Sequence, residues 1–339
     1  MIELTGRQLR ARRMIAQLLA PSAARPEQVQ NLAQTAHYML CTQGQNYRAG
    51  LTGLAVRCGQ KMRYQTAAAA GLDAVLNNYQ VIRTWPQRGT LHYLHQNDYW
   101  MVHLCGSRSV QKDLAQRAQY FSIPLADYSS MKEQVVAACA TLKPRSDLKT
   151  IVQEYAPTQM AAVTSNLLRY LGASGVLIQG PRAGQEDTFI QTEIALAQNK
   201  PDASDHRPPP QQAIREMTRR YMYSRGPARI ADLQWWSGLP KTQLTAAVND
   251  LLKTGQLLQV QYRTSSMYMA PWQEEVTEKE INAALRRQYR LPPFDEYLMS
   301  YKDRDAIFHS QADRTQVLTS NGISWEFTLA NGYITGRSS

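Results

Sequence analysis

The chain has 339 residues, of which 43% are hydrophobic, so it is long enough for two to four domains that each bury a core. Its 38 lysines and arginines against 27 acidic residues give a net charge of +11, which favours a polyanionic partner, with nucleic acid as the leading class. The four cysteines, Cys41, Cys58, Cys105 and Cys139, are far apart and form no Cys-x-x-Cys pair, which argues against a zinc site or a disulfide framework.

Composition also argues against export and membrane insertion. The apolar run at residues 14–20 is interrupted by Gln17 and is too short for the core of a signal peptide. No window approaches the roughly 18 apolar residues of a membrane span. We therefore expect a cytoplasmic, nucleoid-associated protein with reduced thiols and no membrane contact.

The N-terminal segment predicts a basic helix. Thr5 is a favourable helix N-cap, and apolar residues then recur at helical spacing as far as Leu19, before Pro21. The helix is expected to carry its arginines on the exposed side: Arg7, Arg10, Arg12 and Arg13. That side is either a solvated basic face or a surface that contacts phosphates, and the segment alone does not decide between them.

Two glutamines around a glycine, Gln43-Gly44-Gln45, follow the next predicted helix. Apolar residues at helical spacing predict that helix over residues 29–41, with Gly44 as its end, and a further helix is expected to begin near Arg48. Gln43 and Gln45 would then lie on a tight connection between packed helices. A glutamine amide donates and accepts hydrogen bonds but does not titrate, so the pair can orient a water molecule. The alternative is that the two amides only cap neighbouring helix ends.

A hairpin is predicted after a short helix over residues 66–77. Residues 79–85 and 90–94 are rich in β-branched and aromatic side chains, and Pro86 and Gly89 mark the turn between them. Arg83, Arg88 and His92 are expected on its surface, supporting DNA or the glutamine segment. No carboxylate or thiolate completes a ligand set with the histidines here, so we predict no metal site.

Residues 106–203 repeat this order of elements less clearly. Helices are predicted over residues 109–119, 129–142 and 157–172, followed by a hairpin of residues 175–179 with 187–191 around Gly180-Pro181. Helices followed by a hairpin are typical of a winged helix. The proline-rich segment 200–210 is predicted to be a linker.

The third segment, residues 204–275, has the clearest pattern. Helices are predicted over residues 211–223, 230–237 and 240–255, and strands over 257–262 and 266–270. This order is that of a helix-turn-helix variant whose third helix usually contacts bases. The polar residues of that helix are not strongly basic, so packing and base recognition both remain open.

The last segment, residues 276–339, contains Asp295-Glu296 and then Asp303-Arg304-Asp305. Charges so spaced near a proline turn are more often ion-paired structural groups than metal ligands. The four segments 1–105, 106–203, 204–275 and 276–339 are the predicted domains.

Four stretches together resemble the AlkZ-like winged-helix DNA glycosylases, a family that includes the YcaQ type. They are Gln43-x-Gln45; RTWPQRGTLHYL at residues 83–94; RGPARIADLQWWSGLP at residues 225–240; and LPPFDEYLMSYKDR at residues 291–304. The strings RGTLH and FDEYL are the distinctive ones. Asn46 and the short C-terminus depart from the family pattern.

The resemblance implies a mainly α fold with small β-hairpins, in which tandem winged helices form a curved, basic cleft around duplex DNA. It implies hydrolysis of the N-glycosidic bond of an alkylated purine or a purine crosslink, by a monofunctional and monomeric enzyme. The sequence has no motif for binding a metal, a nicotinamide or a nucleotide phosphate, so we expect no cofactor. Gln43 and Gln45 are implied as catalytic residues, and Gln45 places the chain nearer the AlkZ branch, because the YcaQ branch has an acidic residue there. The expected DNA contacts are Arg7, Arg10, Arg13, Arg48, Arg83, Arg88, His92, Arg219 and Arg220.

A cationic N3- or N7-alkylated purine is already a good leaving group, so an enzyme acting on it needs to hold water and stabilise charge. Undamaged bases need protonation to leave and are expected to be poor substrates. The alternative is a non-catalytic winged-helix DNA-binding protein or transcription regulator. Such a protein would dimerise and recognise sequence, and its glutamines would be structural.

Overall fold

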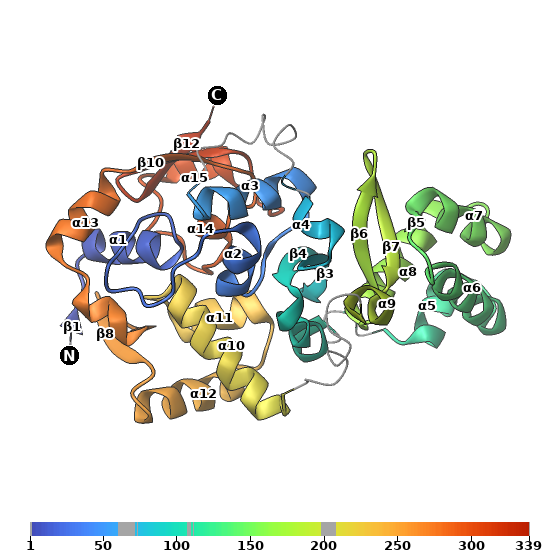
Figure 1. The fold of residues 1–339 in the computed structure, drawn as a ribbon, viewed down its shortest axis with the longest axis horizontal. Coiled ribbons are helices and arrows are strands. Elements are labelled where there is room, and N and C mark those ends of the chain that lie inside the picture. The colour runs from blue at the N-terminus through green and yellow to red at the C-terminus, as the bar shows by residue number, and fades with distance from the viewer. Residues whose placement is uncertain are drawn as a thin grey trace. The chain divides into compact units, whose positions relative to one another are not determined.

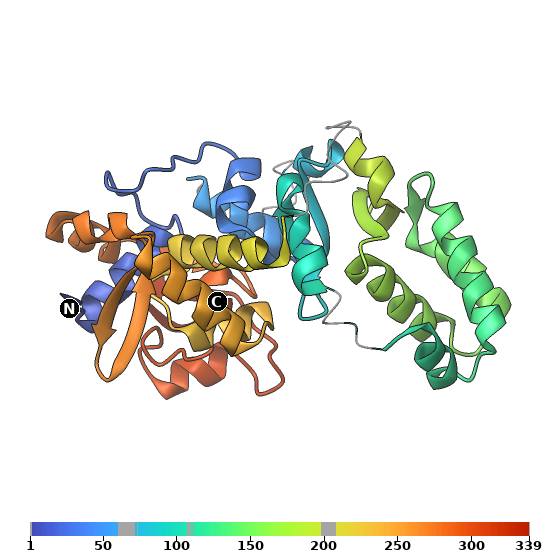
Figure 2. The same ribbon diagram turned by 90° about the horizontal axis from the view of Figure 1, so that it is seen from below.

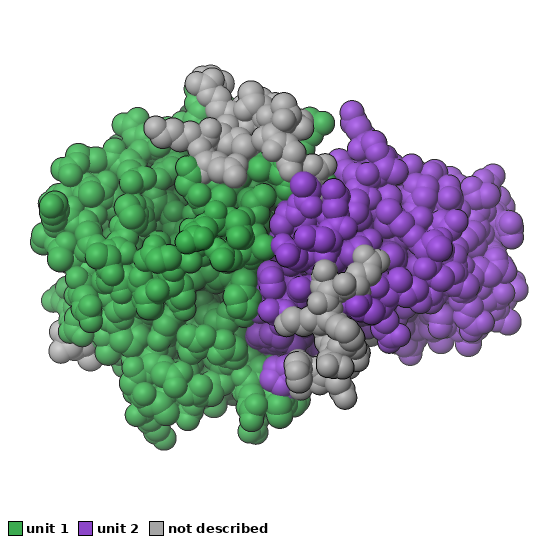
Figure 3. Space-filling model, in the orientation of Figure 1, with its two compact units in different colours: residues 1–72, 209–339 green, residues 73–208 purple. Residues whose placement is uncertain are grey.

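A computed structural model of the protein describes residues 2–59, 72, 74–106, 110, 112–197 and 208–338 (Figure 1). The chain forms two compact units, coloured separately in Figure 3. Unit 1 combines residues 1–72 with residues 209–339, and unit 2 consists of residues 73–208. The predicted segment 1–105 is thus divided between both units, while the predicted segments 204–275 and 276–339 lie almost wholly in unit 1 with the N-terminus.

Within the described residues, three helices and two short strands make up the N-terminal part of unit 1. Helix α1 (Gly6–Ala16) begins at Thr5, whose side chain accepts from the backbone N–H of Gln8 in a capping box, as predicted. Helix α2 (Leu32–Met39) precedes strand β2 (Thr42–Gln43) and helix α3 (Tyr47–Arg57). Leu40 ends α2 with a φ of 64°, so the prediction that Gly44 ends this helix is wrong.

The predicted order of three helices and a hairpin is confirmed for residues 210–269. Helices α10 (Pro210–Arg225), α11 (Ile230–Ser237) and α12 (Lys241–Lys253) precede strands β8 (Leu258–Tyr262) and β9 (Ser265–Met269). Helix α10 is the long yellow helix seen side-on in Figure 2. Strand β1 (Ile2–Glu3) pairs in parallel with β8, which anchors the N-terminus on this hairpin.

The C-terminal part of unit 1 is a small sheet with short helices. Strands β10 (Gln288–Leu291), β11 (Phe327–Ala330) and β12 (Tyr333–Arg337) pair antiparallel in that order. The helical elements are η6 (Pro271–Glu275), α13 (Glu278–Leu285), α14 (Glu296–Met299) and α15 (Gln311–Val317). Asp295 caps α14 by accepting from the backbone N–H of Tyr297.

Unit 2 is built on an antiparallel sheet in the order β4-β3-β6-β7-β5. Its strands are β3 (Val81–Gln87), β4 (Thr90–His95), β5 (Lys143–Pro144), β6 (Leu177–Ala183) and β7 (Glu186–Gln191). The two predicted hairpins, β3–β4 and β6–β7, are therefore confirmed. The turn between β6 and β7 lies beyond Ala183, and not at Gly180 as predicted.

Unit 2 also contains short and longer helical elements beside its sheet. They are α4 (Ala74–Asn77), η2 (Gln96–Asp98), η3 (Val102–Gly106), α5 (Leu114–Tyr120), α6 (Leu125–Ala138), α7 (Arg145–Tyr155), α8 (Met160–Ala173) and α9 (Thr192–Ala197). Helices α5, α6 and α7 lie together in Figure 1, and their core continues through Leu167 of α8 to Trp85 and Phe189 of the sheet. Helix α7 has no counterpart in the predicted set.

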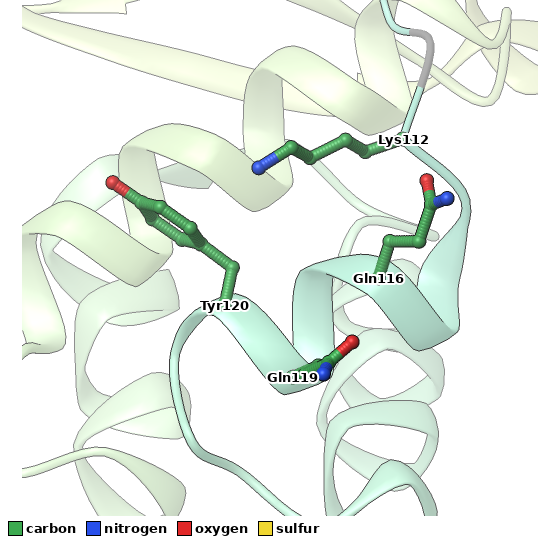
Figure 4. A pocket seen from close by; sticks show the side chains of 4 residues that line it. All are labelled: Lys112, Gln116, Gln119 and Tyr120. Atoms are coloured by element: carbon green, nitrogen blue, oxygen red, sulfur yellow. The ribbon is translucent and has the colours of Figure 1, made fainter.

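An open pocket on unit 2 is lined by Lys112, Gln116, Gln119 and Tyr120 (Figure 4). Lys112 Nζ lies 4.4 Å from the centroid of the Tyr120 ring. None of the predicted site residues lines this pocket.

Helices and small, mostly antiparallel sheets together make a mixed α/β fold. Within the parts of the chain that the structure describes, no helix has both the length and the apolar character that crossing a membrane requires. Most of the predicted linker at residues 200–210 and most of the predicted helix at residues 66–77 lie outside the described residues.

Candidate active site

The Gln43-Gly44-Gln45 segment passes from the interior of unit 1 to its surface. Gln43 is the last residue of β2 and is only 7% exposed, whereas Gln45 is exposed. Asn46 then caps α3 by accepting from the backbone N–H of Ala49 at 3.1 Å. The first glutamine is therefore fixed in the interior, and the second reaches solvent within two residues.

Glu296 holds the backbone of Gln43. Its Oε1 atom accepts a hydrogen bond from the Gln43 backbone N–H at 2.9 Å. Its Oε2 atom accepts from Arg225 Nη2 at 2.9 Å and from Ser300 Oγ at 3.0 Å. Since Glu296 is 3% exposed, this carboxylate is a buried charge that is neutralised by an arginine and is also hydrogen-bonded on both oxygens.

Arg225, at the end of α10, ties down the residues just before Gln43. Its Nη1 atom donates to the backbone oxygen of Met39 at 2.8 Å, and its Nη2 atom donates to that of Cys41 at 2.6 Å. The guanidinium group lies 4.7 Å from the ring centroid of Trp236, and its side chain is fully buried. Arg225 and Glu296 together thus hold three backbone groups between residues 39 and 43.

A second buried ion pair lies beside the first. Arg57 donates to both oxygens of Asp295, at 2.7 and 2.8 Å, and also to the backbone oxygen of Gly53. Burial alone would lower the pKa of Arg57, but the Asp295 carboxylate outweighs that effect, so this pKa is raised and the group stays charged. The pair joins α3 to the start of α14.

A chain of hydrogen bonds connects the two ion pairs. Arg57 Nη2 donates to Gln17 Oε1 at 2.9 Å, and Gln17 Nε2 donates to the Tyr301 hydroxyl oxygen at 3.0 Å. The Tyr301 hydroxyl in turn donates to the backbone oxygen of Arg225 at 2.8 Å. Burial raises the pKa of Tyr301, so it remains a neutral donor in this chain.

The prediction that Asp295 and Glu296 are ion-paired structural groups is confirmed by these contacts. Asp303 is also ion-paired, with Arg229 at 2.9 Å. Sequence reasoning missed the residues that complete the network, Arg57 and Arg225, and missed its connection to Gln43. The stretches at residues 225–240 and 291–304, which carry the family resemblance, contain Arg225 and Asp295-Glu296 and could have pointed to this network.

The prediction that the arginines of α1 lie on its exposed side is wrong for most of them. Arg10 lies over the ring of Tyr333 and Arg13 over that of Tyr301, and Arg12 is buried too. Arg13 Nε also donates to the backbone oxygen of Pro227 at 3.0 Å. Tyr301 and Tyr333, from later segments of unit 1, cover this side of the helix, because arginine stems and guanidinium planes pack well on aromatic rings. In this conformation Arg10 and Arg13 are not accessible to a DNA phosphate.

The other predicted DNA-binding residues of unit 1 differ in exposure. Arg48, in the first turn of α3, is exposed. Arg7 is 41% exposed and pairs with Glu278 at 2.9 Å. Arg219 pairs with Glu216 at 2.8 Å, and Arg220 donates to the backbone oxygen of His37. Three of the four therefore have a protein partner already, and Arg48 lies closest in sequence to Gln45.

In unit 2, the expectation of surface positions is wrong for Arg83 and His92. Arg83 lies on β3, which has a neighbouring strand on each side, and it pairs with Asp187 at 3.0 Å. His92 is fully buried, with Nδ1 at 2.9 Å from the backbone oxygen of Thr90. Arg88 is half-buried at the β3–β4 turn and has a φ of 52°. Because β3 has a neighbouring strand on each side, Arg83 finds its carboxylate partner within the unit.

Comparison with known proteins agrees with the resemblance in the motifs. Residues 37–339 match the family described as DNA glycosylase AlkZ-like. The chain belongs to the AlkZ-like DNA glycosylase family. The predicted resemblance is thus confirmed, and with it the prediction of a DNA glycosylase, for which DNA is the substrate.

The fold of this AlkZ-like protein is similar to that of a solved glycosylase. The structure of Streptomyces sahachiroi DNA glycosylase AlkZ superimposes with a TM-score of 0.73 and 20% sequence identity, over 98% of this chain and 87% of that one. No curated protein matches the sequence. The family match therefore rests on the sequence pattern of residues 37–339, and the structural match supports the fold.

Proposed function

We propose that this AlkZ-like protein is a monofunctional glycosylase that hydrolyses the N-glycosidic bond of N3- or N7-alkylated purines, or of purine crosslinks, in duplex DNA. Gln43 and Gln45 hold the attacking water and stabilise the charge that develops on the sugar. The observation that carries this proposal is the segment itself, which presents an exposed Gln45 beside a backbone fixed by two buried side chains. A flexible surface loop would offer no such fixed position to a water molecule.

Two amides suffice for this chemistry because the substrate supplies its own positive charge. An alkylated N3 or N7 makes the purine cationic, so the bond breaks towards an oxocarbenium-like state without protonation of the base. The amide oxygens can accept from water and the amide nitrogens can donate. Undamaged bases lack this charge and are expected to react slowly, if at all.

Charge and element order support duplex DNA as the bound form. The net charge of +11 favours contact with phosphates. In unit 1, three helices followed by the β8–β9 hairpin have the order of a winged helix, and the β3–β4 and β6–β7 hairpins follow helices in the same way. We propose tandem winged helices around a basic cleft, in a monomer that acts without a cofactor, and DNA contact by Arg48 and Arg88 among the predicted residues.

The test is release of base from DNA that contains 7-methylguanine. Purified protein in excess over a labelled duplex is expected to release free 7-methylguanine and to leave abasic sites that break only after alkali, as a monofunctional enzyme would. Undamaged duplex is the substrate control, and a Gln43→Ala, Gln45→Ala double variant is the protein control. Binding of DNA without release of base would favour the alternative of a non-catalytic DNA-binding protein, especially if the protein dimerises and prefers one sequence.

A further inference from the structure

We infer that Arg225 and Glu296 form a positioning pair for the reaction, which sets where Gln43 and Gln45 stand relative to the substrate. This inference rests on the proposed function of the two glutamines. Neither Arg225 nor Glu296 is exposed enough to touch DNA, since their side chains are 0% and 3% exposed. They act through the backbone of residues 39–43.

This one ion pair forms hydrogen bonds with the backbone on both sides of Thr42. Arg225 donates to the carbonyl oxygens of Met39 and Cys41, and Glu296 accepts from the N–H of Gln43. Donors therefore hold the chain before Thr42, and an acceptor holds it after. Because Arg225 Nη2 also bonds Glu296 Oε2 at 2.9 Å, a shift of either side chain moves both anchor points. The pair fixes the direction in which the chain leaves β2 towards Gln45.

Charge makes these backbone contacts strong and directional. Hydrogen bonds with an ionised partner are shorter and stronger than neutral ones, and a planar guanidinium group offers several donors in a fixed geometry. A lysine at position 225 keeps the positive charge but has one nitrogen, which cannot hold two carbonyl oxygens and a carboxylate with the same geometry. Arg225→Lys is therefore a change in position and direction more than in charge.

Arg57 and Asp295 supply a matched control in the same core. Their side chains are 1% and 0% exposed, and Arg57 also has several partners, including a backbone oxygen. Within the described part of the chain, the side-chain hydrogen bonds of this pair reach Gly53, Gln17, the backbone N–H of Tyr297 and each other, and none involves the backbone of residues 39–43. Arg57→Lys should then lower stability by a similar mechanism without redirecting the Gln-x-Gln segment.

The experiment compares Arg225→Lys with Arg57→Lys in the full chain. For each variant, melting temperature, DNA affinity and single-turnover excision of 7-methylguanine at saturating enzyme are measured. We expect both to melt at lower temperature and to bind DNA as the wild type does, but only Arg225→Lys to lose excision, by about 10-fold or more. Equal losses of excision in the two variants, or undiminished excision by Arg225→Lys, would overturn the inference.

Glu296 provides a second series that does not depend on Arg225→Lys folding well. Glu296→Gln keeps an oxygen that can accept from Gln43 N–H, whereas Glu296→Ala removes it. The expected order of excision rates is wild type, then Glu296→Gln, then Glu296→Ala, with DNA affinity unchanged throughout. Asp295→Asn is measured beside these variants as a control. If the excision rates of all three variants fall in proportion to their melting temperatures, Glu296 has a purely structural role.

Backbone hydrogen exchange separates failure of this inference from failure of the proposed function. Whatever the activity of the protein, Arg225→Lys should speed amide exchange in residues 40–46 more than Arg57→Lys does. If the wild type releases no base but this difference is found, the proposed glycosylase chemistry is wrong and the anchoring is right. If the two variants exchange alike, the anchoring itself is refuted.

Discussion

Gln43 donates its backbone N–H to Glu296 Oε1 at 2.9 Å, across 253 positions of sequence. The segment that we propose for catalysis lies near the N-terminus, and the residue that holds its backbone lies near the C-terminus. Unit 1 contains both because residues 1–72 and 209–339 fold together. Residues near both ends of the chain thus form one candidate site, and substitutions in either part should affect the Gln43-Gly44-Gln45 segment.

Replacement of Gln45 by alanine should affect chemistry and leave folding intact. Gln45 is exposed, so its side chain contributes little to packing. If it holds the attacking water, Gln45→Ala should lower single-turnover excision by roughly 10²-fold or more, while DNA affinity and melting temperature stay close to wild type. Gln43→Ala should be as damaging to excision. Because Gln43 is buried, that variant should also lose about 1 kcal/mol of stability.

A carboxylate at position 45 tests the same role by replacement. Gln45→Asp and Gln45→Glu should retain activity, because a carboxylate also accepts from water. A stable, DNA-binding Gln43→Ala, Gln45→Ala double variant that excises base at the wild-type rate would refute the catalytic assignment and leave the glutamines as structural amides.

The wild-type excision rate should be nearly independent of pH. Amides do not titrate, and an alkylated purine is already cationic, so at saturating enzyme the single-turnover rate is expected to be flat from about pH 6 to 9. Gln45→Asp introduces a group with a pKa near 4, so its rate should fall only as the pH drops towards about 4. Measuring both proteins on the same duplex checks this. A wild-type rate that changes with pH, with a midpoint between about pH 6 and 9, would require a titrating catalytic group.

Local patterns in the sequence predicted much of the fold. Helix α11 begins and ends as expected, and the N-cap at Thr5 and the hairpins were found because capping residues, helical spacing and β-branched runs are short-range features. The end of α2 was misplaced because Leu40, and not a glycine, adopts a positive φ there. Nothing in the local pattern distinguishes such a leucine from its neighbours.

The candidate site was predicted less completely, for a physical reason. Helical spacing placed Gln43 and Gln45 between two helices, and the family resemblance implied their role, but their anchors depend on contacts between residues far apart in sequence. The buried arginines were misplaced because a charge is ordinarily expected at the surface. Arg13 and Arg83 are exceptions, since an aromatic ring and a carboxylate from distant segments accept them in the interior. Only the folded chain brings those partners together.

Gly172 should tolerate no larger residue, although it lies in a helix. A Cβ atom placed there would be 2.2 Å from Trp85 Cε3, inside the apolar cluster of unit 2. In an open helix, replacing glycine by alanine stabilises by about 0.5–1 kcal/mol. Here overpacking should dominate, and Gly172→Ala should destabilise by about 1–3 kcal/mol. Chemical denaturation gives the sign, and an increase in stability would mean that Trp85 can move aside freely.

Arg48 and Arg13 should differ sharply when each is replaced by alanine, although both were predicted to contact DNA. Arg48 is exposed beside the Gln-x-Gln segment, so Arg48→Ala should weaken DNA binding uniformly across sequences and lower the slope of log affinity against log salt by about 1. Its melting temperature should not change. Arg13 is buried over Tyr301 and donates a hydrogen bond to the backbone oxygen of Pro227, so Arg13→Ala should destabilise the protein by about 3 kcal/mol. At a temperature where the Arg13→Ala variant is folded, its slope of log affinity against log salt should equal that of the wild type.

Fluorescence titrations from low to high salt, together with melting curves, check both variants. A salt slope that falls in Arg13→Ala, or stays unchanged in Arg48→Ala, would reverse this assignment of which arginine meets the phosphates.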